Sequence, residues 1–376
     1  MPTDTGAPLL LIVCGDPSGD LHAASLIAAL KRRAPGVRVA AVGGPLSRAV
    51  ADEFVEDLAA RGVTGFVRPI LTLRFLRGLL ERLEQFMRTR RPAALVCIDY
   101  YGFNRRVLER ARRAGVPALY YVSPQVWASR PGRVHVLRQL VQRMLVIFPF
   151  EESLYREAGV PVEFVGHPLL DRIPTPAPRR PAPSAGHTRR VGLLPGSRRS
   201  ELEAHVPMLL EAFRLLRETR PDLEGLIFAP PSQPDAAYGT LPPGVRLVRE
   251  EDYAVRSTLD IALCKSGTAT LENAMLGIPM VVLYRTSWPE YLAARAVARV
   301  KFIAMPNLLA GREVVTELIQ QQATSQRLAS EAAALLDNPQ RYDAVRADLL
   351  ALRDKLGGPG AADRAAAAIL TALPVK

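Results

Sequence analysis

The sequence predicts an α/β protein made of two doubly wound parallel-sheet domains. Apolar runs typical of strands alternate with helix-like stretches along most of the chain, which is the pattern of a parallel sheet joined by crossover helices. A proline-rich stretch divides these elements into two series, and 376 residues are enough for two cores. Folds of this class bind ligands at the carboxyl ends of their strands, so we expect the site residues at those ends.

The first series begins with a strand at residues 9–13, followed by a helix at residues 21–33. Further runs of strand length alternate with polar, helix-like segments such as residues 104–114. These strand-like runs lie at residues 37–42, 93–98, 118–122, 144–147 and 163–165. We therefore expect a first Rossmann-like domain over residues 1–173.

Residues 174–186 form the predicted linker, because the sequence PTPAPRRPAPS at its start is too rich in proline for a helix or a strand. The second domain is expected over residues 187–350, with strand-like runs at residues 191–194, 225–229, 245–248, 261–264 and 279–284. Helical stretches at residues 325–355 and 360–373 end the chain. We expect these stretches to pack back on the first domain, with residues 351–376 as its C-terminal helix.

Composition and charge limit the class of protein. A hydrophobic content of 48% excludes a disordered chain, and no apolar run approaches the roughly 20 residues that cross a bilayer. The run at residues 9–13 is too short for a secretory signal, so an intracellular protein is expected. Cys14, Cys97 and Cys264 each end an apolar run, which is typical of buried free thiols rather than of a disulfide or a metal site. The net charge of +12 favours an anionic partner: nucleic acid, an acidic lipid surface or a phosphorylated substrate.

Two glycine-bearing loops in the second domain each follow a strand-like run and precede a helix-like one. They are LLPGSR at residues 193–198 and SGTATLE at residues 266–272. Glycine lets the backbone approach an oxyanion, a hydroxyl donates a short bond, and the next helix presents unpaired N–H groups. Structural turns share this pattern, but two such loops in one domain favour a nucleotide-diphosphate site. Its candidate residues are Gly196, Ser197, Arg198, Ser266, Gly267 and Thr268, with Glu272 either on the ribose hydroxyls or on the helix surface.

In the first domain, the sequence CGDPSGD at residues 14–20 follows the first strand, and Asp99 follows the run at residues 95–98. Asp16, Ser18, Gly19 and Asp99 are therefore expected at the carboxyl edge of the sheet. Helix capping is the alternative role for Asp16 and Asp20, and strand-end capping is the alternative for Asp99.

Residues 71–87 combine an apolar stripe with many arginines, including Arg74, Arg77 and Arg82. Such a stripe faces a protein core in most helices. Dense arginine beside excess apolar side chains also suits a segment that rests on an anionic bilayer. The residues expected to face the membrane in that second interpretation are Leu71, Phe75, Leu76 and Leu79.

The chain resembles the lipid-A-disaccharide synthase family over nearly its whole length. The motifs that carry the resemblance are, besides the two glycine loops, GDPSGD at 15–20, YYVSPQVWA at 120–128, FPFE at 148–151, FVGHP at 164–168, the segment at 279–285, and PNLLAGRE at 306–313. The resemblance implies the GT-B fold, in which two Rossmann-like domains face each other across a cleft. It also implies an inverting hexosyltransferase, which joins UDP-2,3-diacylglucosamine to 2,3-diacylglucosamine 1-phosphate and releases a β-1,6-linked disaccharide and UDP.

The resemblance assigns roles to the candidate residues. Asp99 becomes the catalytic base, and Asn307 and Arg312 join the donor site. The alternatives are a turn or capping role for Asn307 and a surface salt bridge for Arg312. No Asp-x-Asp sequence follows an apolar strand, so we expect neither a metal nor another cofactor. The family also implies a cytoplasmic protein on the inner membrane surface and a homodimer that can exchange its C-terminal region.

The chain departs from the family at two of these motifs. Asp16 and Pro17 replace the usual Glu and Ala, and residues 99–104 read DYYGFN where the family has DAPDFN. These changes keep open a relative with another acceptor or another sugar-nucleotide enzyme of this fold, such as an epimerase. Nucleic-acid binding is disfavoured, because aromatic residues are only 6% of the chain and no known nucleic-acid motif is present.

Overall fold

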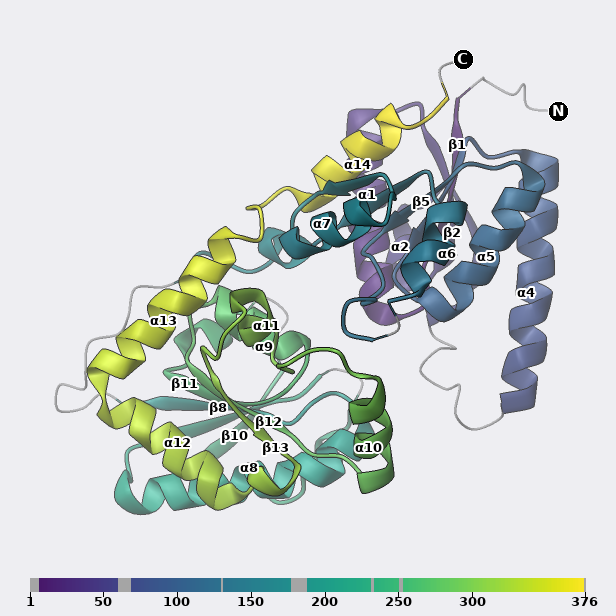
Figure 1. Cartoon of the computed structure of the whole chain (residues 1–376). Coiled ribbons are helices and arrows are strands. Elements are labelled where there is room, and N and C mark those ends of the chain that lie inside the picture. The colour runs from purple at the N-terminus through teal and green to yellow at the C-terminus, as the bar shows by residue number, and fades with distance from the viewer. Residues whose placement is uncertain are drawn as a thin grey trace. The chain divides into compact units, whose positions relative to one another are not determined.

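The computed structural model describes residues 7–59, 69–129, 131–176, 188–230, 233–249 and 253–374, with only the backbone for residues 69–72. The chain divides into two compact units. Unit 1 comprises Met1–Asp171 and Leu356–Lys376, and unit 2 comprises Arg172–Lys355. Each unit is built around its own sheet (Figure 1).

The described part of unit 1 holds a seven-stranded parallel sheet in the order β3-β2-β1-β4-β5-β6-β7. The order reverses direction at β1, as in a doubly wound fold. The strands are β1 (Leu9–Val13), β2 (Arg38–Gly43), β3 (Glu53–Asp57), β4 (Ala94–Ile98), β5 (Ala118–Tyr121), β6 (Arg143–Val146) and β7 (Val162–Phe164). The helices are α1 (Pro17–Arg33), α2 (Pro45–Val50), α4 (Pro69–Arg90), α5 (Tyr101–Ala114), α6 (Arg133–Leu140), α7 (Pro149–Glu157) and α14 (Ala361–Thr371).

Both faces of this sheet are covered. Leu10 and Ile12 of β1 point to one face and Leu11 and Val13 to the other, and all four are fully buried. Helices on the two faces shield such continuous apolar strands from water, which is why the strands read as unbroken hydrophobic runs. The C-terminal helix α14, drawn in yellow, packs beside α1 (Figure 1).

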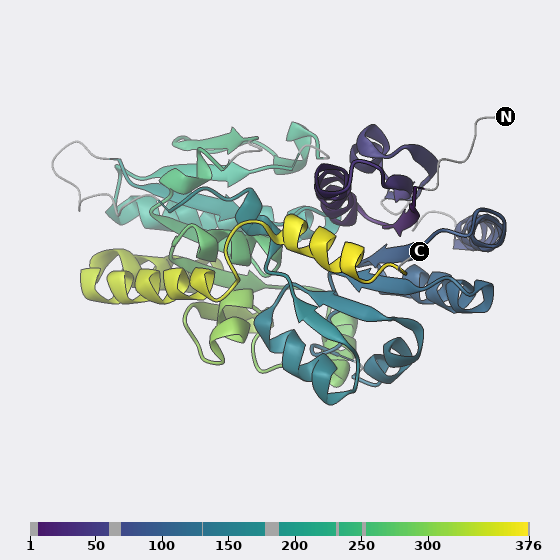
Figure 2. The same ribbon diagram turned by 90° about the horizontal axis from the view of Figure 1, so that it is seen from above.

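Helix α4 lies at the periphery of unit 1 in both views (Figures 1 and 2), yet much of its apolar stripe faces inward. Leu79 is fully buried in the core of unit 1, so the expectation that it faces a membrane is wrong. Its neighbours along the stripe, Leu83 and Met87, are also fully buried, because the helix packs against α5. The stripe of the C-terminal half of α4 is thus an ordinary core-facing stripe.

The N-terminal half of α4 is different. Phe75 and Leu76 are half-buried against the same core, and Leu73 is 58% exposed. Leu71 belongs to α4, but its side chain lies outside the described residues. A membrane role is therefore a proposal for this half of the helix only.

The described part of unit 2 holds a six-stranded parallel sheet in the order β10-β9-β8-β11-β12-β13. The strands are β8 (Arg190–Leu194), β9 (Glu224–Phe228), β10 (Val245–Val248), β11 (Ile261–Lys265), β12 (Met280–Tyr284) and β13 (Thr316–Ile319). The helices are α8 (Arg199–Thr219), α9 (Thr268–Met275), α10 (Trp288–Val297), α11 (Met305–Ala310), α12 (Ser325–Asp337) and α13 (Pro339–Asp354).

Helices α12 and α13 belong to unit 2 and pack on its helices α8 and α9, whereas the sequence led us to expect them as additions to the first domain. Leu328, Ala332 and Leu335 of α12 belong to the core of unit 2. The guanidinium of Arg353 near the end of α13 donates to the carbonyl oxygen of Met275 over 2.8 Å. The apolar face of α12 is thus buried in the core of unit 2. Of the C-terminal helices, only α14 belongs to unit 1.

Candidate active site

The loop after β1 in unit 1 is organised by Asp16. Its carboxylate accepts a 2.6 Å bond from the Gly19 amide and a 3.0 Å bond from the Ser18 hydroxyl, so Asp16 is the N-cap of α1. Ser18 and Gly19 lie in the first turn of α1, directly after Asp16, and the capping role weighed for Asp16 is present. A role in binding substrate remains a proposal for all three.

Asp20 has a structural role of another kind. Its buried carboxylate accepts bonds from the amides of Gly44, Leu46 and Ser47 over 2.8 to 3.0 Å. These are the unpaired N–H groups at the start of α2, so Asp20 ties α1 to the end of β2.

Asp99 lies between β4 and α5 in an unusual backbone conformation. Its φ is 44° and that of Tyr100 is 47°, in the left-handed region that non-glycine residues rarely adopt. The carbonyl oxygen of Asp99 accepts a 2.8 Å bond from the buried Asn104 side chain and a further bond from the Tyr120 hydroxyl. Two side chains thus hold the turn that presents the Asp99 carboxyl at the end of β4. Such enforced strain is frequent at functional sites.

The environment raises the pKa of the Asp99 carboxyl from its ordinary value of 3.8 to about 6. Burial is the larger cause, since it disfavours the charged form, and the negative charge of Asp16 adds to it. A hydrogen bond from the Tyr100 backbone lowers the pKa in part. An aspartate with a raised pKa is a stronger base than a free one, and it is still ionised at neutral pH.

Two buried groups lie at the neighbouring strand ends. Glu151 accepts bonds from the Ser123 hydroxyl at 2.6 Å and the Trp127 indole at 3.1 Å, and burial raises its pKa to about 7. The His167 ring lies tilted against Phe148 with 5.0 Å between ring centres, and burial lowers the pKa of His167 to about 3. Both side chains are almost inaccessible, and Glu151 ties the loop after β5 to the start of α7.

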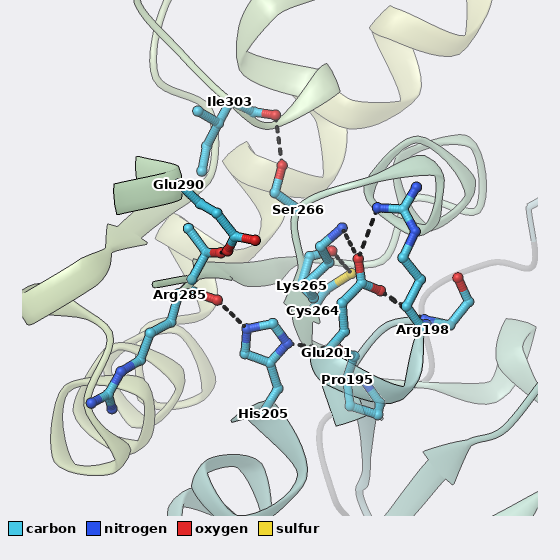
Figure 3. A network of polar contacts seen from close by, with 12 residues as sticks. Pro195, Arg198, Glu201, His205, Cys264, Lys265, Ser266, Arg285, Glu290 and Ile303 are labelled. Atoms are coloured by element: carbon cyan, nitrogen blue, oxygen red, sulfur yellow. Dashed lines mark hydrogen bonds and ion pairs between the residues drawn. The ribbon is translucent and has the colours of Figure 1, made fainter. Parts of the chain in front are cut away.

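In unit 2, the loop after β8 closes around a carboxylate (Figure 3). Gly196 adopts a φ of 114°, and Arg198 is the N-cap of α8 with a side chain that is 81% exposed. The amides of Ser197 and Arg198 donate to Glu201 over 2.9 and 3.2 Å. The N–H groups expected to bind a diphosphate therefore donate to Glu201, a residue of the helix α8 that follows the loop.

The loop after β11 leads directly into α9. The Ser266 hydroxyl donates to the carbonyl oxygen of Ile303 over 2.7 Å, while Gly267 and Thr268 are exposed at the start of the helix. Lys265, the last residue of β11, extends its ammonium group to within 3.0 Å of the Glu201 carboxylate. The pair joins the two glycine loops, as Figure 3 shows.

His205 links a third loop to this arrangement. One ring nitrogen lies 2.8 Å from the carbonyl oxygen of Pro195 and the other 3.0 Å from that of Arg285 (Figure 3). The buried ring therefore connects the loop after β8 to the loop after β12. This contact holds the glycine loop at residues 193–198 in place.

Glu272 lies one turn into α9 and is mostly buried. It accepts a 2.8 Å bond from the Tyr253 hydroxyl and forms an ion pair with Arg256. A carboxylate has about four accepting positions. Ribose hydroxyls therefore remain possible partners, but the side chain is not on a free helix surface.

Asn307 lies in α11, and Arg312 lies in the segment between α11 and β13. The buried Asn307 side chain donates to Val315 and Glu317 and accepts from the amides of Val314 and Val315. All of its side-chain polar atoms are hydrogen-bonded, so a direct hydrogen bond to the sugar-nucleotide donor would replace one of these bonds. Arg312 is exposed and pairs with Asp348 of α13 over 2.6 Å, which is the salt bridge weighed from the sequence.

Sequence reasoning missed Glu201 and Lys265 as members of the site. The signal for Glu201 was its position three residues after Arg198, where a glutamate reaches back to the start of its helix. Lys265 directly precedes Ser266, but only the sheet register places it beside β8. The three cysteines are buried free thiols, and the described residues hold no group of three or more potential metal ligands.

Two parallel-sheet units with glycine loops at strand ends define a protein of the GT-B fold class. Solved structures agree with this class. The calicheamicin glycosyltransferase CalG4 matches 98% of this chain and 99% of its own with a TM-score of 0.64 and 16% identity. UDP-GlcNAc 2-epimerase from Neisseria meningitidis bound to UDP-GlcNAc matches 96% and 100% with a TM-score of 0.61 and 14% identity. At these identities the likeness shows the fold alone, and the predicted fold class is confirmed.

Sequence comparison defines the family. The profile described as lipid-A-disaccharide synthetase matches residues 10–370. The lipid-A-disaccharide synthase of Syntrophus aciditrophicus is 41% identical over 372 residues, covering 96% of this chain and 97% of that protein. The chain therefore belongs to the lipid-A-disaccharide synthase family, and it is a glycosyltransferase of lipid A biosynthesis.

Proposed function

We propose that this enzyme transfers 2,3-diacylglucosamine from its UDP derivative to the 6-hydroxyl of 2,3-diacylglucosamine 1-phosphate. In a single displacement with inversion, the acceptor oxygen bonds to the anomeric carbon as the bond from that carbon to the UDP oxygen breaks. The acceptor proton passes to a base, and UDP leaves with the bonding electron pair. The products are the β-1,6-linked disaccharide 1-phosphate and UDP.

Asp99 is the proposed base. The environment of its carboxyl group at the end of β4 is the observation that supports the proposal. Its backbone is held in a strained turn, and its pKa is raised to about 6. A positioned base of this kind contributes roughly 10²- to 10⁴-fold to the rate. Asp16, together with Ser18 and Gly19 in the first turn of α1, is proposed to contact substrate, since the charge of Asp16 acts on Asp99.

Unit 2 is the proposed donor site. Charge that develops on UDP would meet Arg198 and the N–H groups at the starts of α8 and α9, which lie in the loops of Gly196 and Gly267. These groups can replace a metal ion, so we expect the reaction to need neither a divalent cation nor another cofactor. Glu272 is proposed near the ribose.

Both substrates carry acyl chains, so the enzyme is proposed to work at the cytoplasmic face of the inner membrane. No helix in the described residues is long and apolar enough to cross a membrane. The exposed Leu73 with Phe75 and Leu76 in the first half of α4, flanked by Arg74 and Arg77, supports contact with an anionic surface. A homodimer is proposed from the family alone.

The decisive experiment incubates the purified protein with both diacylated substrates and a chelator, and identifies the products by mass spectrometry. We expect a disaccharide 1-phosphate and UDP in the absence of divalent metal. An epimerised donor sugar without a disaccharide would support the epimerase alternative instead, and a requirement for added metal would contradict the proposed donor site.

The matched variant is Asp99→Asn, which keeps the size of the side chain and removes the base. We expect product formation to fall by roughly 10²-fold or more, while UDP binding stays within a few-fold of the wild type. Arg198→Ala should weaken both. If Asp99→Asn keeps most of the activity, the base is another group.

A further inference from the structure

The carboxylate of Glu201 occupies a site built from hydrogen-bond donors in unit 2 (Figure 3). One oxygen accepts bonds from the amides of Ser197 and Arg198 over 2.9 and 3.2 Å. The other lies 3.0 Å from the ammonium of Lys265 and 3.7 Å from the guanidinium of Arg198. Backbone amides from a glycine loop, a lysine and an arginine are the donors that proteins use to bind a phosphate group.

The fit of this carboxylate is close. Glu201 and Lys265 are mostly buried, with side chains 14% and 18% exposed. A Cβ placed on Gly196 would lie 2.3 Å from a Glu201 oxygen, so the loop leaves room for the carboxylate and for no side chain. The neighbouring cations and amides hold the pKa of Glu201 below its ordinary value despite its burial. The side chain is therefore a negative charge at neutral pH.

Helix capping accounts for only part of this arrangement. In a capping box, a glutamate at the third helical position accepts a bond from the amide of the N-cap residue, which here is Arg198. A box does not involve the preceding amide of Ser197, nor a lysine from another strand. Lys265 comes from β11, which pairs with β8 in the sheet, and it is brought to Glu201 by the tertiary fold.

We propose that Glu201 is an internal anion that occupies the diphosphate cradle of unit 2 when no donor is bound, and that Lys265 is a diphosphate-binding residue that Glu201 releases. This inference rests on the proposed function, since it assigns the phosphate contacts of the same site. When a diphosphate enters, its oxygens replace the carboxylate as acceptors for Lys265 and for the loop amides. Glu201 then weakens donor and product binding by competition, which favours the release of UDP.

The first test is Glu201→Gln, with UDP binding measured by calorimetry. Removal of one negative charge near the phosphates should tighten binding by roughly tenfold or more, since two unit charges about 12 Å apart at an effective dielectric constant near 20 already repel by the equivalent of a tenfold change in affinity. The amide of glutamine keeps the shape and one accepting oxygen. A weaker affinity for UDP would show that Glu201 only organises the loop, and it would overturn the proposal.

The matched control is Glu203→Gln, in the same turn of α8. Glu203 is exposed and pairs with Arg199 over 2.9 Å, so it carries the same charge without access to the cradle. We expect its UDP affinity to equal that of the wild type. Equal tightening in both variants would indicate a general charge effect and would contradict a specific role for Glu201.

The second test is Lys265→Met, which keeps the length of the side chain and removes its charge. UDP binding should weaken by roughly tenfold or more. Lys31→Met is its control, because Lys31 lies in unit 1 and pairs with Asp52. Unchanged UDP affinity in Lys265→Met, with a thermal unfolding midpoint near that of the wild type, would overturn the assignment of Lys265.

Binding of inorganic pyrophosphate separates this inference from the proposed function. If pyrophosphate and UDP bind with the expected dependence on Glu201 and Lys265 but no disaccharide forms, the cradle is correct and the proposed reaction is wrong. If the disaccharide forms and neither variant changes the affinity, the reaction stands and the inference fails. A wild-type protein that binds neither UDP nor pyrophosphate would contradict both.

Discussion

The raised pKa of Asp99 predicts how activity depends on pH. With a pKa of about 6, the carboxyl is about 90% ionised at pH 7 and about 10% ionised at pH 5. Because a base must be ionised to accept a proton, kcat/KM should fall about tenfold between these two values. An aspartate with its ordinary pKa of 3.8 would lose less than about 10% over the same interval.

The acceptor complicates this measurement, because a phosphate monoester also titrates with a pKa of about 6. The variant Asp16→Asn separates the two effects. It removes one of the two causes that raise the pKa of Asp99, and asparagine still caps α1. The acidic limb of the kcat/KM profile should therefore move to lower pH, but it should stay above 3.8, since burial is the larger cause.

The assay is the initial rate of UDP release between pH 4.5 and pH 8.5, at substrate concentrations well below KM. Glu109→Gln is the control, because Glu109 is an exposed residue of α5 that pairs with Arg105 over 3.0 Å. Its profile should coincide with that of the wild type. An acidic limb at the same pH in Asp16→Asn and in the wild type would refute the reasoning, because the limb would then belong to the substrate or to another group.

Three further predictions concern the stability of the fold. Gly196→Ala should lower the free energy of unfolding by about 1–3 kcal/mol, because the φ of 114° and the nearby Glu201 oxygen both oppose a side chain. Chemical denaturation measures this loss, and an unchanged midpoint would contradict the prediction. Leu79→Ala should lower the free energy of unfolding by about 2–5 kcal/mol because Leu79 is a core residue, whereas Leu73→Ala should change it by no more than about 0.5 kcal/mol. An equally small loss in both variants would restore the membrane interpretation of Leu79. Asn307→Ala should lower the thermal unfolding midpoint, because it leaves buried backbone groups unpaired; a loss of UDP affinity with no loss of stability would instead favour direct contact with the donor.

The interior strands of both sheets were predictable from the sequence, whereas β3 and β13 were not. Interior strands are buried on both faces, so they appear as continuous apolar runs. The strands β3 and β13 lie at the sheet edges, and their sequences EFVED and TELI carry charged residues that no apolar pattern distinguishes from loop. One edge of each sheet therefore required the structure, whereas the opposite edge strands, β7 and β10, were predicted from their apolar runs.

Helix α4 shows a limit of periodicity of another kind. The spacing of Leu76, Leu79 and Leu83 specifies one apolar face, but it does not state whether protein or lipid covers that face. In the structure α5 and the sheet of unit 1 cover Leu79 and Leu83, and Leu73 remains exposed. Only the packing of neighbouring elements could divide the stripe in this way.

The sequence by itself determined the parallel sheets, the glycine loops and the position of Asp99 at a strand end, because these depend on residue type and on spacing along the chain. The tertiary structure decided which groups act on one another. Asp16 raises the pKa of Asp99 because β1 and β4 are adjacent, and Lys265 meets Glu201 because β11 lies beside β8. Electrostatic interactions depend on distance in space, and strand order sets that distance in a way that local sequence does not encode.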